Sequence, residues 1–277
     1  MSMSGKVYVV GNFKGGVGKT KVVTMLAYQS AVTKNKKTLV VDLDPQGNAT
    51  SVLARTGNIT SIDKSITEGF KHENLVDQVT NIIDNLDLIP ANTAFRNLSK
   101  ILIEKYPDDE NAQVFYLREL LEPLKEHYDA IYIDVPPTIS DYSDTAMLAA
   151  DYCIIVLQTQ ELSLDGASTY IAYMQYLADT YDSNLNVLGL IPMMLRKGGR
   201  VDEEILQQAK EKYGNNVLNT VINYQERLKV YDVEGISMKY NVNGKLDMWD
   251  KKAHQVFENV LAELEEHEQY FESLGIN

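Results

Sequence analysis

Cysteine and long apolar runs are scarce in this sequence, and each scarcity excludes a class of protein. The 277 residues include one cysteine, Cys153, so one chain cannot form a disulfide framework or a cysteine-ligated cluster. We expect Cys153 to be a small buried core side chain. No apolar stretch approaches the roughly 18 residues of a membrane span, and the N-terminus lacks a secretory-signal pattern. These features predict a cytoplasmic protein.

Lysine and arginine are also fewer than the acidic residues. The chain has 26 lysines and arginines against 39 aspartates and glutamates, a net charge of −13. An acidic balance argues against extensive nucleic-acid contact, which depends on cations that neutralise phosphates. A dimer can still focus a small basic patch. Any DNA contact is therefore expected to be local and sensitive to salt.

Apolar runs alternate with helical patterns along the chain, and no repeat divides it. The 44% hydrophobic content suffices for one core, so we predict a single domain over residues 1–277. This alternation predicts an α/β fold, a mostly parallel twisted sheet with helices on both faces. Strands are expected at 6–10, 38–42, 86–90, 154–157 and 187–192, and before Asp134. Helices are expected at 20–33, 94–105, 113–126 and 164–179, with a closing helix within 250–277.

The richest motif is FKGGVGKT at residues 13–20, between the first predicted strand and the first predicted helix. Gly15, Gly16 and Gly18 allow backbone N–H groups to wrap around phosphate oxygens at a helix N-terminus. Lys19 is then placed along the β- and γ-phosphates, and the Thr20 hydroxyl can be a ligand of Mg²⁺. The alternative is a glycine-rich turn that binds nothing, which requires strand, lysines and threonine to coincide by chance.

The common phosphate loop has its first glycine at the position that Phe13 takes here. A second lysine, Lys14, follows Phe13. With this deviant P-loop the chain resembles the ParA/MinD superfamily of ATPases. The resemblance implies an ATP-dependent sandwich dimer in which Lys14 reaches the partner's nucleotide and neutralises charge during phosphoryl transfer. It also implies ATP and Mg²⁺ as cofactors, and nucleotide contacts from Lys14, Gly15, Gly16, Val17, Gly18, Lys19, Thr20 and Lys21.

Three aspartates end predicted strands at the edge where ligands of open α/β sheets bind. Asp42 and Asp44 lie in DLDPQGN, which is similar to the ParA branch, and the resemblance implies that Asp44 positions the hydrolytic water. The alternative for both is that they end a strand and begin a turn. Asp134, in a Walker B pattern before two prolines, is expected to hold Mg²⁺ together with Thr20.

Two further sites follow from the resemblance. Pro192 and Met193 correspond to the adenine side of the site. Basic residues in two later segments correspond to regions that bind DNA without reading its sequence: Arg196, Lys197, Arg200, Arg227 and Lys229. Here the sequences LRKGG and NYQERLK depart from the family pattern, and solvated loop surface is the alternative reading.

The two ends of the chain help to distinguish the branches of the ParA/MinD superfamily that the sequence resembles. Six glutamates within 253–274 disfavour a membrane-binding helix of the MinD type, and the phosphate loop begins too early for a preceding helix-turn-helix domain. The resemblance then implies a ParA-type ATPase for plasmid or chromosome partition. Its expected partners are a second copy, nonspecific DNA and a ParB-type centromere-binding protein, in a nucleoid-associated location. The alternatives are an ATPase that positions a protein cargo without DNA and a metabolic P-loop ligase.

Overall fold

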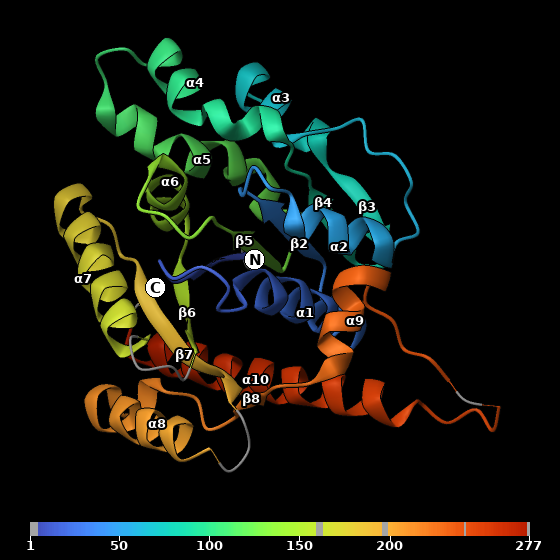
Figure 1. The fold of residues 1–277 in the computed structure, drawn as a ribbon. Coiled ribbons are helices and arrows are strands. Elements are labelled where there is room, and N and C mark those ends of the chain that lie inside the picture. The colour runs from blue at the N-terminus through green and yellow to red at the C-terminus, as the bar shows by residue number, and fades with distance from the viewer. Residues whose placement is uncertain (1–4, 159–162, 196–198, 241, 276–277) are drawn as a thin grey trace.

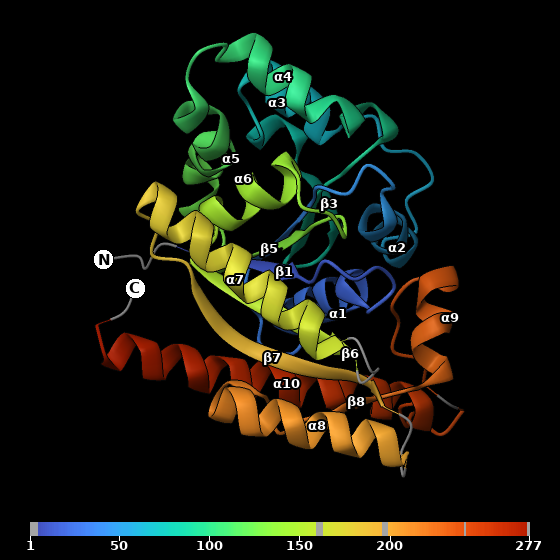
Figure 2. The ribbon, with the colours of Figure 1, turned by 60° about the vertical axis from the view of Figure 1, so that its left-hand side comes forward.

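One mixed sheet organises the chain. The computed structural model describes residues 5–158, 163–195, 199–240 and 242–275. Within these ranges the sheet has eight strands in the order β3-β4-β2-β5-β1-β6-β7-β8 (Figures 1 and 2). All neighbouring strands are parallel except β3 and β4. The bounds are β1 Lys6–Gly11, β2 Thr38–Asp42, β3 Thr80–Ile83, β4 Leu86–Ile89, β5 Ala130–Asp134, β6 Tyr152–Gln158, β7 Asn186–Leu195 and β8 Ile222–Asn223.

Helices cover both faces of this sheet, which confirms the predicted fold class (Figure 2). Short 3-10 turns at Val76–Gln78, Thr93–Asn97 and Gly214–Asn216 accompany them. The helices are α1 Lys19–Val32, α2 Asn48–Thr56, α3 Ile66–His72, α4 Leu98–Lys105, α5 Glu110–Lys125, α6 Asp141–Ala149, α7 Ser163–Tyr181, α8 Arg200–Tyr213, α9 Glu226–Glu234 and α10 Met248–Ser273. None of the helices in the described ranges combines the length and apolar composition needed to cross a bilayer.

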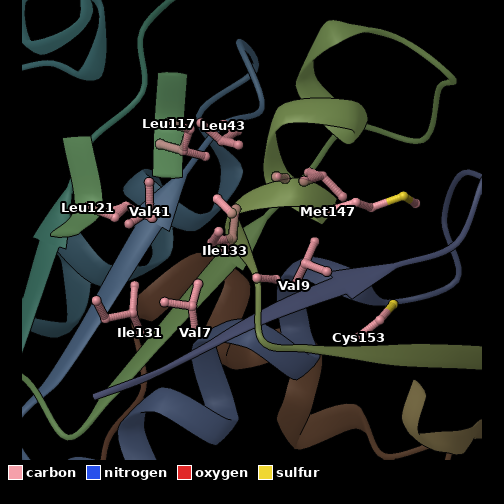
Figure 3. Packing of buried hydrophobic residues seen from close by; sticks show 14 of the residues in the cluster. Val7, Val9, Val41, Leu43, Leu117, Leu121, Ile131, Ile133, Met147 and Cys153 are labelled. Atoms are coloured by element: carbon pink, nitrogen blue, oxygen red, sulfur yellow. The ribbon is translucent and has the colours of Figure 1, made fainter. Parts of the chain in front are cut away.

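The central strands are apolar on both faces because each face is covered. Successive side chains of a strand point to opposite sides, so Val7 and Val9 of β1 pack in one core and Tyr8 and Val10 in the other. In the first core they meet α5 and α6, as Figure 3 shows for Leu117, Leu121 and Met147. The second core lies under α1, α2, α9 and α10.

Cys153 is buried, as the sequence predicts, and the C-terminal helix α10 packs on the sheet. The Cys153 thiol is buried in the first core, and burial raises its pKa to about 12. On α10 the side chains of Val260, Leu261 and Leu264 are buried in the second core. Its contacts with α1 explain why an otherwise acidic helix is held against the sheet.

Several predicted boundaries differ from the structure, and two of the differences have a clear physical reason. Residues 94–105 are not one helix, because Thr93–Asn97 is a 3-10 turn that precedes α4. The predicted strand end at Pro192 is also wrong, since β7 continues to Leu195. Pro192 has no N–H to donate, yet it still pairs with Leu157 of β6 in the parallel register. The register of β7 shifts near both of its ends.

Candidate active site

The glycine loop connects β1 to α1 and leads into the first turn of that helix. Gly16 and Gly18 have φ angles of 73° and 99°, a region that L side chains rarely adopt. Gly18 is the N-cap of α1, and the first turn of the helix has no acidic side chain. Unpaired N–H groups and the helix dipole therefore face the loop with no acidic side chain in the helix's own first turn, which favours an anion.

Lys19 lies across this loop rather than in solvent. Its Nζ donates to the carbonyl oxygens of Asn12 at 2.9 Å and Lys14 at 3.3 Å. Burial lowers its pKa, and the carboxylates of Asp134 and Asp44 oppose that effect. The ammonium is thus held where phosphate oxygens bound by the loop can replace the two carbonyls.

Asn12 is a structural residue of the site that sequence reasoning missed. Its Nδ2 donates to the Val156 carbonyl of β6 at 2.8 Å, and its Oδ1 accepts from the N–H of Lys14 at 2.9 Å. The side chain therefore fixes the start of the loop, including the backbone of Lys14, to the neighbouring strand. The available signal was an asparagine directly between an apolar strand and the glycine loop.

Asp134 and Thr20 form the pair expected at a magnesium site. The Thr20 hydroxyl donates to Oδ2 of Asp134 at 2.8 Å. The other oxygen, Oδ1, is buried and has no hydrogen-bond partner among the described residues. Burial and the neighbouring carboxylate of Asp42 raise the Asp134 pKa well above its ordinary value. A hard cation or its bound water would satisfy the orphaned oxygen, so the donor set fits Mg²⁺.

Asp42 lies beside Asp134 on the adjacent strand, but its carboxylate already has hydrogen-bond partners. Its carboxylate accepts the N–H and hydroxyl of Thr50 at 2.8 and 2.7 Å, and the N–H of Asp44 at 3.1 Å. Burial raises its pKa to about 6, against these hydrogen bonds. Asp42 therefore shapes the segment that carries Asp44. Asp44 accepts the Gln46 N–H at 2.9 Å and lines the cavity described next.

A cavity of about 670 Å³ joins these elements. It extends from the glycine loop past Asp44 and the Pro137 turn to α2 and α9. The lining comprises Gly16, Val17, Gly18, Lys19, Thr20, Lys21, Asp44, Gln46, Asn48, Ser51, Val52, Arg55, Val135, Pro137 and Asp232. Six of the ten residues expected to contact nucleotide therefore line one space with the expected water-positioning carboxylate.

Lys21 makes a contact that the sequence did not indicate. Its Nζ lies 2.5 Å from both the Leu228 carbonyl and Oδ1 of Asp232 on α9. Arg55 of α2 donates to the Asp232 carbonyl at 2.8 Å. The first turn of α1 is thereby tied to α9, so one wall of the cavity depends on a segment more than 200 residues away in sequence.

Pro192 and Met193 lie elsewhere. Both are buried in β7, where Met193 packs in the second core, and neither belongs to the described lining of the cavity. Their adenine contact stays a prediction.

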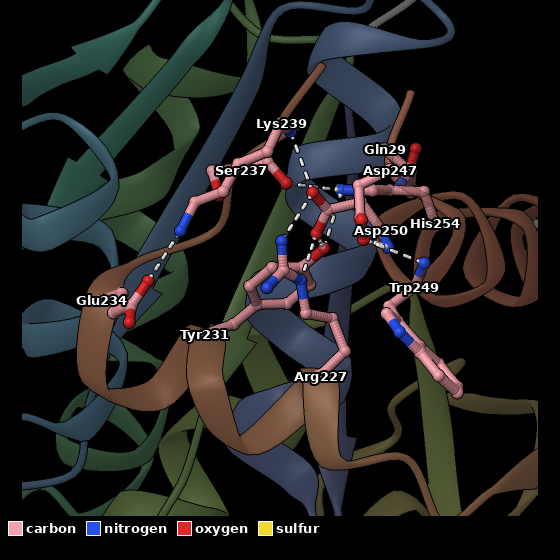
Figure 4. A network of polar contacts seen from close by, with 10 residues as sticks. All are labelled: Gln29, Arg227, Tyr231, Glu234, Ser237, Lys239, Asp247, Trp249, Asp250 and His254. Atoms are coloured by element: carbon pink, nitrogen blue, oxygen red, sulfur yellow. Dashed lines mark hydrogen bonds and ion pairs between the residues drawn. The ribbon is translucent and has the colours of Figure 1, made fainter. Parts of the chain in front are cut away.

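The five basic residues predicted to contact DNA have different environments. Arg196 and Lys197 lie outside the described residues. Arg200 begins α8, with a side chain 87% exposed near Glu204, and Lys229 is exposed near Glu226. Arg227 instead pairs with the fully buried carboxylate of Asp250, as Figure 4 shows. A phosphate contact by Arg227 would have to compete with that ion pair.

Comparisons with known proteins agree with this geometry. A family model described as "AAA domain" matches residues 5–187. The chromosome-partitioning ATPase Soj of Treponema pallidum is 33% identical over 218 residues, covering 79% of this chain and 83% of that protein. The sporulation initiation inhibitor protein Soj of Bacillus subtilis is 31% identical over 231 residues, covering 81% and 86%. The chain belongs to the ParA/MinD family of P-loop ATPases.

Solved structures place this ParA/MinD-family ATPase in the same fold. Apo McdA of Cyanothece superposes with a TM-score of 0.77 at 21% identity, covering 95% of this chain and 98% of that one. A putative plasmid partition protein of Borrelia burgdorferi bound to AMPPNP gives 0.76 at 24% identity, covering 95% and 99%. At these identities the likeness concerns the fold.

Proposed function

We propose that this ATPase hydrolyses ATP with Mg²⁺ in the 670 Å³ cavity and uses the reaction as a partition switch. The observation that carries the proposal is the Thr20–Asp134 pair, with its orphaned carboxylate oxygen, beside a glycine loop at a helix N-terminus. The loop N–H groups and Lys19 bind the phosphates. Thr20 and Asp134 hold Mg²⁺, which neutralises charge on the β- and γ-phosphates when bound.

Water activation is assigned to Asp44. Its carboxylate lines the cavity and is oriented by the Gln46 N–H. It accepts a hydrogen bond from the attacking water and so directs the oxygen lone pair toward the γ-phosphate. Lys14, whose backbone is fixed by Asn12, supplies positive charge to the nucleotide of a second copy. Hydrolysis accordingly needs an ATP-bound sandwich dimer.

Duplex DNA and a partner protein complete the cycle. The ATP-bound dimer binds DNA without sequence preference through basic side chains at the start of α8, where Arg200 is exposed. A ParB-type centromere-binding protein accelerates hydrolysis and releases the dimer. Relatives named chromosome-partitioning and plasmid-partition proteins support this reading.

The test is DNA binding by purified protein without nucleotide, with ADP and with ATP, at several stated salt concentrations. Binding that requires ATP, weakens with salt and disappears in Lys14→Ala supports the switch. Arg200→Glu should weaken binding, whereas Lys100→Glu on the distant helix α4 should not. Absence of DNA affinity in the unmodified protein with intact ATP binding excludes partition.

The second candidate is an ATPase that positions a protein cargo without DNA. It is favoured by the TM-score of 0.77 to McdA, a protein not named as a partition factor, and by the net charge of −13. Under this reading the ATP-dependent dimer forms, yet duplex DNA leaves its ATPase rate and its sedimentation unchanged.

A further inference from the structure

A second concave surface lies apart from the nucleotide cavity and shares none of its described lining residues. A groove of about 710 Å³ opens between β8, α9 and the first turns of α10. Its lining includes the half-buried valines Val221, Val230 and Val256, together with Tyr224 and Trp249. An apolar lining of this kind takes apolar side chains from a ligand.

The two aromatic side chains at this groove are left in solvent. Tyr224 is 51% exposed and Trp249 is 57% exposed. Figure 4 shows the Trp249 indole extending away from the buried carboxylate of Asp250. Exposed tyrosine and tryptophan beside an apolar hollow are typical of protein-binding surfaces, where these residue types supply much of the binding energy.

Lysines stand over both rings. Nζ of Lys252 lies 5.0 Å from the Trp249 ring centroid, and Nζ of Lys229 lies 4.8 Å from the Tyr224 ring centroid. Glu226 is the acidic group on this rim, where it pairs with Lys229 at 3.7 Å and accepts the Tyr224 hydroxyl at 2.9 Å. The rim therefore carries two cations and one anion.

Charge in this region differs from that of the rest of the chain. Residues 221–256 contain six lysines and arginines against five acidic residues, whereas the remainder contains 20 against 34. Arg227 and the buried Asp250 neutralise each other, which leaves five cations and four acids and a net charge of +1. With Arg227 paired to Asp250 and Lys229 to Glu226, Lys252 leaves the groove a small positive excess on an acidic protein, which favours an occupant of negative charge.

We propose that this groove binds an acidic amphipathic helix of a partner protein. Apolar side chains spaced at i, i+3 or i+4, and i+7 fill the hollow over the valines, and Trp249 and Tyr224 flank them. Carboxylates on the edges of that helix pair with Lys252 and Lys229. Duplex DNA fits less well, because its backbone offers the valine-lined hollow nothing apolar.

The chain supplies its own probe for a test, since Trp249 is its single tryptophan. Two synthetic helical peptides of about 18 residues are compared, with one leucine stripe flanked either by glutamates or by lysines. Burial of Trp249 should shift its emission to the blue with the glutamate peptide. The lysine peptide should bind at least about tenfold more weakly. Equal binding of both peptides, or binding of neither, overturns the proposal.

Fluorescein-labelled glutamate peptide then tests the residues by anisotropy. We expect about tenfold weaker binding for Lys252→Glu and a larger loss for Trp249→Ala. Lys100→Glu, an exposed lysine on α4, is the matched control and should bind normally. Circular dichroism and ATP binding confirm that each variant is folded. Unchanged binding by Lys252→Glu, or displacement of the peptide by duplex DNA, assigns the groove to another ligand and overturns the proposal.

Discussion

Two aspartates in this molecule are equally buried, yet their surroundings are opposite. Asp134 and Asp250 both have no solvent exposure. Burial and Asp42 raise the Asp134 pKa, and Oδ1 of Asp134 has no hydrogen-bond partner among the described residues. Burial also acts on Asp250, but hydrogen bonds from Arg227 and Tyr231 bring its pKa below the ordinary value. An unsatisfied buried carboxylate indicates a ligand site, whereas a satisfied one indicates structure.

The surroundings of Asp250 join three helices (Figure 4). Arg227 Nη2 donates to Oδ2 of Asp250 at 2.7 Å, and the Tyr231 hydroxyl donates to Oδ1 at 2.5 Å. His254 contacts Gln29 of α1 at 2.5 Å through its Nδ1. Burial lowers the pKa of His254, which keeps the ring neutral. The network thus fixes α9 between α10 and the helix that begins at the glycine loop.

The largest expected effect is on catalysis. Asp134→Asn keeps the side chain's shape but removes the charge that we propose holds Mg²⁺, so we expect kcat for ATP hydrolysis to fall about a thousandfold. Urea denaturation should show no loss of stability, because an unpaired buried carboxylate has been removed. A fall of less than about tenfold would place the magnesium ligand elsewhere.

Asp250→Asn should have the complementary phenotype. Loss of the carboxylate leaves the Arg227 guanidinium without its charged partner, and we expect the free energy of unfolding to fall by about 3 kcal/mol. ATPase activity per folded molecule should stay near normal. The double variant Arg227→Met, Asp250→Leu should cost less than the single change. If the double variant is the less stable of the two, the pair stabilises the fold in its own right.

The pH dependence of stability should have opposite signs in the two regions, at Asp42 beside Asp134 and at Asp250. Asp42 has a folded-state pKa of about 6 against 3.8 when unfolded, so its ionisation should reduce stability by up to about 3 kcal/mol as pH rises from about 4 to 6. Asp250, with its lowered pKa, contributes stability that is lost on acidification below about pH 4. Unfolding by urea at pH 3 to 8 measures both effects. Asp42→Asn should flatten the upper segment, and a slope unchanged by that substitution would refute the assignment.

The smallest expected effect concerns Tyr231. Tyr231→Phe removes one of several hydrogen bonds to Asp250 while the ion pair persists, so we expect a loss of about 1 kcal/mol in unfolding free energy. Tyr224→Phe, at an exposed tyrosine, is the matched control. Equal losses in the two variants would mean that the buried hydroxyl has no special role.

The sequence predicted the central strands and the glycine loop well because their patterns are local in the chain. Apolar runs such as Thr38–Asp42 match the observed strand, and strand, glycines and helix are consecutive in the chain. It failed where tertiary contacts override local pattern. The β7 strand passes through Pro192, and the conformation at residues 93–97 changes within one predicted helix.

What the sequence determined by itself is the set of chemical groups at the phosphate loop, because Gly16, Gly18, Lys19 and Thr20 lie within five residues and their geometry is local. Only the tertiary structure decided the roles of the distant charges. The sequence alone gives Arg227 as a surface cation, but α10 brings Asp250 to it. Lys21 stays a predicted nucleotide contact, and α9 adds an ion pair with Asp232 that the sequence did not indicate. Such pairings depend on packing between segments far apart in the chain, and no local pattern encodes them.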